Sequence, residues 1–151
     1  MLVKLSSNIP TYAYTLVATF VIGIIIVSSC ALSMANLKNE AENQQLTNIA
    51  KYVATQSLIL LAHQAANNQN VTQLLQVPTQ VGNQIYWISI GSDSGGAWVQ
   101  TGFGTTLNPS QPHIPIPAKT TASGFFVSTF GRAFLQYCSN NQTAILTLIS
   151  E

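Results

Sequence analysis

The sequence predicts an α+β fold, in which a long N-terminal α-helix, first hydrophobic and then amphipathic, precedes a small antiparallel β-sheet or sandwich domain. No charged residue occurs from Leu5 to Leu37. Apolar residues then recur at the three-four spacing of an amphipathic helix. From Val71 the period shifts towards two, with Gly, Pro and Asn between the segments. We therefore expect a helical region over residues 1–66 and a β-domain over residues 67–151, which is close to the smallest size that holds its own core.

The apolar part of the predicted helix is long enough to span a bilayer. Ala13 to Ala35 comprises 23 residues without a charge, and a membrane span needs about 20. The segment is too long for the apolar core of a secretory signal peptide. Pro10 suits the first helical turn, where its missing N–H is harmless, and Ser7 or Asn8 can cap the helix.

Two features of this apolar segment each have two interpretations. Gly23 permits either a close approach of another backbone or a local break, or it is tolerated filler. Tyr12 and Tyr14 fit an aromatic belt at the membrane interface, and they also fit simple packing.

The amphipathic part of the helix carries an apolar stripe that needs a partner. Polar residues such as Asn43, Thr47 and Lys51 occupy the opposite side. A helix from Thr11 to Ala66 would be about 85 Å long at 1.5 Å per residue, and only about 30 Å of it could lie in hydrocarbon. The stripe must therefore pack on the chain's own β-domain, on neighbouring helices, or on both. Its members are Leu46, Ile49, Ala50, Val53, Ala54, Ser57, Leu60, Leu61 and Gln64, and among them we select Leu46, Ile49, Val53 and Leu61 as the packing residues.

Six segments of the C-terminal half have the alternation of β-strands. Gly91 to Gly96 predicts a hairpin connection, and residues 130–132 and 139–141 are further turns. Asn108 to Pro117 contains four prolines and cannot be a central strand, so we expect an extended, exposed connection there. The expected strands are Thr72–Val77, Gln84–Ile90, Ala97–Phe103, Gly124–Thr129, Ala133–Cys138 and Thr143–Ile149.

The charge content excludes nucleic-acid binding. Charged residues make up 6% of the chain and the formal net charge is +1, against about 25% charged residues in soluble proteins. Five scattered basic residues form no cluster that could displace the counterions of a nucleic acid. Because 47% of the residues are hydrophobic, the low charge does not indicate disorder. A surface of neutral polar groups repels its own copies weakly.

Neither a catalytic nor a metal site is expected. Cys30 and Cys138 lie too far apart in the predicted layout for a disulfide, and we interpret both as small buried hydrophobes. Two Cys and two His are too scattered to bind a metal. His63 and His113 have no carboxylate nearby in the sequence, and Asp93 suits a turn. We therefore predict a protein that is not an enzyme and that carries no cofactor.

Two tripeptides match the acceptor pattern for N-glycosylation, at Asn70 and at Asn141. Occupied sites would place the β-domain outside the cell.

In this arrangement the chain resembles archaeal type IV pilins and the archaellin-like subunits of related filaments. The resemblance rests on the layout: one helix over Pro10–Ala66, apolar to about Ala35 and amphipathic after it, and a Thr- and Asn-rich β-domain over Val71–Glu151. The acidic residue near the start that marks bacterial type IV pilins is missing, which favours the archaeal branch. Precursors in the family carry a short basic leader, and Met1–Asn8 offers only Lys4.

The resemblance implies a subunit that the membrane holds before assembly, and that pilus assembly machinery then extracts and stacks. In such filaments the apolar helices form the core and the β-domains form an outer sheath. Outside lipid, the apolar side chains need cover from neighbouring copies. The positions expected in this core are Leu16, Val17, Phe20, Val21, Ile24, Ile25, Val27 and Leu32.

We accordingly expect a structural subunit of an extracellular archaeal filament on the cell surface. It would polymerise with itself and serve adhesion or surface attachment. The alternative is a single-pass membrane protein, either a minor pilin or an accessory of the filament machinery, with its β-domain outside the cytoplasm. Copy number in sheared surface material would separate the two.

Overall fold

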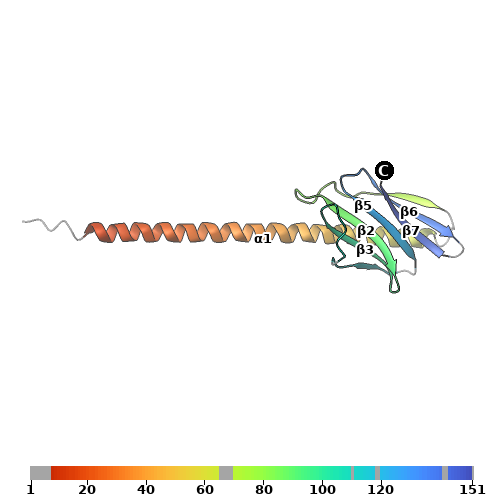
Figure 1. Ribbon diagram of the computed structural model, residues 1–151, viewed down its shortest axis with the longest axis horizontal. Coiled ribbons are helices and arrows are strands. Elements are labelled where there is room, and N and C mark those ends of the chain that lie inside the picture. The colour runs from red at the N-terminus through yellow and green to blue at the C-terminus, as the bar shows by residue number, and fades with distance from the viewer. Residues whose placement is uncertain (1–7, 65–69, 110, 118–119, 141–142, 151) are drawn as a thin grey trace, which may run out of the picture. The chain divides into compact units, whose positions relative to one another are not determined.

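The computed structural model describes residues 8–64, 70–109, 111–117, 120–140 and 143–150, and it confirms the α+β class (Figure 1). Within these residues the chain forms one α-helix, α1 (Asn8–Gln64), and seven strands. The strands are β1 (Val71–Leu75), β2 (Tyr86–Asp93), β3 (Gly96–Phe103), β4 (Ile114–Ile116), β5 (Thr121–Val127), β6 (Ala133–Asn140) and β7 (Thr143–Ser150).

The chain divides into two compact units, and the division falls inside α1. The first unit is Met1–Ala41 and the second is Glu42–Glu151. The sequence predicted a division at residues 66 and 67, where the helix was expected to end. The predicted and observed divisions differ because apolar residues of α1 from Leu46 to Leu61 share one core with the strands.

In the first unit, α1 remains helical although its side chains include several hydroxyl groups. Four of these hydroxyls, those of Thr15, Thr19, Ser29 and Ser33, donate to a carbonyl of the preceding turn; Thr19 Oγ1 to Thr15 O at 2.7 Å and Ser29 Oγ to Ile25 O at 2.8 Å are two examples. Such bonds satisfy the hydroxyl donors within the helix itself. The helix can therefore contain these polar residues even where its surroundings, such as lipid, offer no hydrogen-bond partner.

In the second unit, one face of α1 lies against the sheet. Eight of its side chains are buried: Glu42, Leu46, Ile49, Ala50, Val53, Ala54, Ser57 and Leu60. Polar contacts fix the helix along the sheet as well. Thr101 Oγ1 donates to Leu46 O at 3.3 Å, and Gln73 Nε2 donates to Gln56 Oε1 at 2.6 Å.

The strands form one sheet with the order β1-β6-β7-β5-β2-β3-β4. Its helix-facing side carries Tyr86, Ile88 and Ile90 of β2, which belong to the hydrophobic core together with the buried residues of α1. Among the described strands, β5 and β7 pair in parallel and the other neighbours pair antiparallel. The expectation of an antiparallel sheet is thus corrected at β5–β7. The alternation of apolar residues marks the buried face of a strand, and it does not specify the direction of the neighbouring strand.

The proline-rich segment contains a strand that the sequence did not predict. Residues Ile114–Ile116 form β4, which pairs with Ala97–Val99 of β3, and Ile116 is buried. The expectation that all of Asn108–Pro117 is an exposed connection is therefore wrong. Because β4 is the last strand of the sheet, Pro115 lies on an edge strand, where proline is tolerated.

A segment before β4 covers part of the other sheet face. The buried Gln100 of β3 donates through Nε2 to Asn108 O at 3.1 Å and to Gln111 O at 2.8 Å. These two bonds hold residues 108 and 111 against β3. The same face buries Trp87, which lies so close to Gly102 that an added Cβ would be 2.5 Å from its ring. Glycine at this position is therefore what lets the indole pack flat on β3.

Candidate assembly surfaces

The first candidate surface is the apolar helix of the first unit. All side chains described from Thr11 to Ala41 are exposed. The eight expected filament-core side chains are each between 49% and 70% exposed: Leu16, Val17, Phe20, Val21, Ile24, Ile25, Val27 and Leu32. Ile22, Ile26 and Met34 are exposed as well, so the helix is apolar on all sides. A helix of this kind is stable only when lipid or other protein covers it.

This helix is long and apolar enough to cross a membrane. The finding rests on its length and composition. The exposed Cys30 lies on the same surface, and it corrects the expectation that both cysteines are buried. In the part of this unit that the structure describes, the side chains project from a single helix, and no second described element of the unit covers them. Cys138, in β6, is half-buried.

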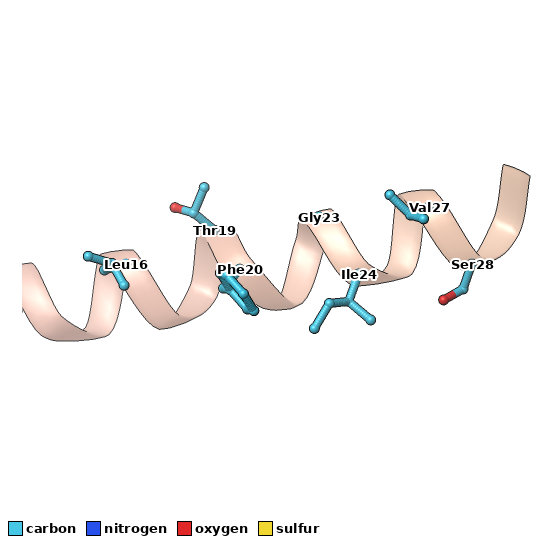
Figure 2. A pocket seen from close by; sticks show the side chains of 7 residues that line it. All are labelled: Leu16, Thr19, Phe20, Gly23, Ile24, Val27 and Ser28. Atoms are coloured by element: carbon cyan, nitrogen blue, oxygen red, sulfur yellow. The ribbon is translucent and has the colours of Figure 1, made fainter.

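A shallow hollow interrupts the apolar surface at Gly23 (Figure 2). Phe20 and Ile24 flank it, and Leu16, Thr19, Val27 and Ser28 complete its wall. No atom outside the local helix backbone lies within 4 Å of the position where a Cβ on Gly23 would stand. The hollow therefore exists because residue 23 has no side chain. A neighbouring helix could place a side chain there.

The second unit uses its own sheet to cover the amphipathic stripe. Leu46, Ile49 and Val53 are 8% exposed or less, and Leu61 is half-buried against the same core. The sequence left open whether these residues pack on the β-domain or on neighbouring helices. The structure places them against the β-strands of the same chain.

Glu42 is a buried residue that the sequence reasoning missed. Its side chain is 5% exposed, and Oε2 accepts a hydrogen bond of 2.9 Å from Gln84 Nε2. Its position four residues before Leu46 continues the stripe by one turn, and that spacing was the available signal. A glutamate is ordinarily assigned to the solvent side, because carboxylates are almost never buried without partners.

The second candidate surface is a cleft between α1 and the start of β4. Its volume is about 410 Å³, and Leu46 and Ala50 of the helix and Ile114 of β4 give it an apolar lining. Lys51 and His113 lie at the same cleft. His113 also stacks on Trp98 of β3, with ring centroids 4.2 Å apart and planes at 5°. This stack holds the segment before β4 on the sheet and so fixes one wall of the cleft.

The described residues include few His, Cys, Asp and Glu side chains. No group of three His, Cys, Asp or Glu side chains among them could hold a metal ion. Asp93 lies in the β2–β3 turn, where Oδ1 accepts from Gly95 N at 2.7 Å. His63 is exposed near the end of α1. Burial raises the pKa of Tyr86 to about 12; its hydroxyl donates to Pro78 O.

Of the two possible glycosylation sites, Asn70 is exposed. Asn141 lies outside the described residues.

Comparisons with protein-family models, curated proteins and solved structures found no match. The described residues thus form an α+β chain with one helix long and apolar enough to cross a membrane and with one seven-stranded sheet.

Proposed function

We propose that this chain is a structural subunit of an extracellular filament resembling archaeal type IV pili, and that it polymerises through its N-terminal apolar helix. The observation that carries the proposal is the helix surface from Ala13 to Ala35, which has exposed apolar side chains on all sides and no charge. Within the membrane, lipid covers this surface. In a filament on the cell surface, the same surface would be covered by helices of neighbouring copies.

The energetic argument favours assembly once the helix leaves lipid. Burial of apolar surface contributes about 25 cal/mol per Å². Covering about 1,500 Å² of one helix would therefore contribute tens of kcal/mol before the entropic costs of association. A contact of this strength makes the filament effectively permanent.

The low charge of the chain supports self-association as well. Only 6% of its residues are charged, so close packing of many copies costs little electrostatic work. In this proposal the partners are the membrane, the assembly machinery and other copies of the chain, while nucleic acid is not a partner. Adhesion or surface attachment is the role, and the protein is not an enzyme.

One observation favours a second function, that of a membrane-anchored minor pilin or accessory protein. The amphipathic stripe on residues 46–60 is already covered by the sheet of the same chain. The second unit therefore needs no neighbour, and the apolar helix could remain in the membrane as an anchor. An accessory protein would stay in the membrane fraction in low copy number.

The test is the substitution Ile24→Asp, with Ile24→Leu as its matched control. An aspartate in the centre of a membrane helix costs only about 2.5–3.5 kcal/mol for insertion, so the variant should still reach the membrane. In a packed filament core it would be an unpaired buried charge and should abolish fibres. The control should assemble normally. Normal fibres from the aspartate variant would contradict the proposal.

A further inference from the structure

The second unit has very few charges, and two of them form no ion pair with another residue that the structure describes. Asp93 is the one exposed acidic side chain in its described part, since Glu42 is buried. Lys51 is exposed on α1. Neither Asp93 nor Lys51 forms an ion pair with a described residue.

Asp93 lies on a slender projection. It forms the last pair of the β2–β3 hairpin with Gly96, and the connection can be followed between those strands in Figure 1. The tip continues through Ser94 and Gly95, so its side chains are small. One carboxylate oxygen of Asp93 accepts from Gly95 N at 2.7 Å, and the other forms no hydrogen bond with a described residue. The tip of the β2–β3 hairpin thus carries one acidic group and otherwise small side chains.

Lys51 lies at an opening of suitable size. The cleft between α1 and the start of β4 has a volume of about 410 Å³, which is within the range of about 300–1,000 Å³ that accommodates small ligands. Its lining is mainly apolar, with Lys51 and His113 as its basic groups. A low-dielectric lining strengthens the attraction between an entering carboxylate and Lys51.

Asp93 at the tip and Lys51 at the cleft do not form an ion pair with each other within one chain. Thr101 of β3 lines the cleft, while the tip begins at Gly96 on the same strand. Five residues of strand separate this part of the cleft from the tip, which is about 17 Å at 3.3 Å per residue. The end of the cleft at Pro115 lies nearer the tip, because Pro115 pairs with Trp98. Both charges are thus available to a second copy.

We propose that the β2–β3 tip of one copy docks in the α1–β4 cleft of the next copy, with Asp93 of the first copy facing Lys51 of the second. The contact joins two different surfaces, so it is heterologous and generates an open helical polymer when it does not close into a ring. This inference rests on the proposed filament function and adds the contact that sets the register between neighbouring sheet domains. An exposed ion pair contributes little affinity by itself. Its main effect is to select one register, because a wrong register leaves charges facing like charges or apolar lining.

The test is a charge exchange in the full-length chain expressed in its filament-forming host. Asp93→Lys and Lys51→Asp each place like charges at the contact. Each single variant should lower fibre yield about tenfold or more, since like-charge juxtaposition costs several kcal/mol. The double variant with both substitutions restores opposite charges and should recover most of the wild-type yield. Arg132→Asp is the matched control, because Arg132 is an exposed base that lies at a different cleft.

The outcomes separate this contact from the proposed function. Tryptophan fluorescence reports whether each variant folds, because Trp87 and Trp98 both lie in the sheet. If the wild type forms fibres and both single variants form them in normal yield, the proposed contact is overturned and the proposed function is not. A double variant whose fibre yield is no higher than that of the folded single variants would also overturn the contact. Rescue of Asp93→Lys by Arg132→Asp instead of Lys51→Asp would assign the tip to the other cleft. Absence of wild-type fibres would overturn the proposed function and the contact together.

Discussion

Gln84 donates a hydrogen bond of 2.9 Å through Nε2 to Oε2 of Glu42, which links the turn before β2 to the buried face of α1. The turn is shaped around this carboxylate. Gly82 has φ +60°, and a Cβ there would stand 2.1 Å from Glu42 Oε1. The backbone bonds between Val81 and Gln84 close the same turn. Glu42 therefore fixes the helix and the turn relative to each other within the second unit.

The first prediction concerns this relationship. Gly82→Ala should lower the free energy of unfolding by about 2–4 kcal/mol, because alanine is strained at positive φ and its Cβ displaces the Glu42 carboxylate. In a Glu42→Ala background the same change should cost only the backbone strain, about 1–2 kcal/mol. Urea unfolding in detergent, followed by tryptophan fluorescence, gives the double-mutant cycle. Strictly additive effects would show that the two residues are independent.

The second prediction tests which face of α1 packs on the sheet. Leu60 is 5% exposed and its neighbour Ile59 is 44% exposed. Leu60→Ala should cost about 2–5 kcal/mol because it leaves a cavity in the core. Ile59→Ala should cost less than about 1 kcal/mol. The same unfolding assay measures both. Equal losses at the two positions would contradict the helix orientation described here.

The third prediction concerns the parallel pair of strands. Gly124 of β5 has φ +144°, and an added Cβ would lie 2.5 Å from Leu148 O of β7. Since the obstacle is backbone, Gly124→Ala should cost more than about 3 kcal/mol. Gly104→Ala is the control, because Gly104 also has positive φ but has no atom within 4 Å. The control should lose only about 1–2 kcal/mol. Comparable midpoints of unfolding for the two variants would argue against the β5–β7 pairing.

The fourth prediction is a pH dependence. Burial raises the pKa of Tyr86 to about 12, above its ordinary value near 10. Between these values the folded state retains a proton that the unfolded state releases. Stability should therefore fall as pH rises from 10 to 12, by up to about 1.4 kcal/mol per pH unit. Tyr86→Phe should remove this part of the slope. Tyrosinate absorbance that titrates completely near pH 10 in the folded protein would contradict the assignment.

The sequence was sufficient for the helix and for most of the sheet, because both depend on periodicity. An uncharged run of this length has few alternatives to a helix able to cross a membrane. The three-four spacing marks Leu46, Ile49 and Val53, and these side chains lie against the sheet. Strands such as β2 and β3 have enough β-branched and aromatic residues to be recognised locally.

The remaining features depend on contacts between distant residues. β4 was missed because the four prolines of its segment suppress any strand signal, and only pairing with β3 at the sheet edge makes Ile114–Ile116 a strand. The parallel β5–β7 pair depends on chain topology, which alternation does not encode. Glu42 was not included in the apolar stripe, because its partner Gln84 lies 42 residues away in the sequence.

The most direct test of the filament proposal is microscopy of sheared surface material from the native host, combined with mass spectrometry of the fibres. The account predicts thin fibres in which this chain is the dominant protein. A chain that stays in the membrane fraction, is monomeric in detergent and is absent from any fibres would contradict it.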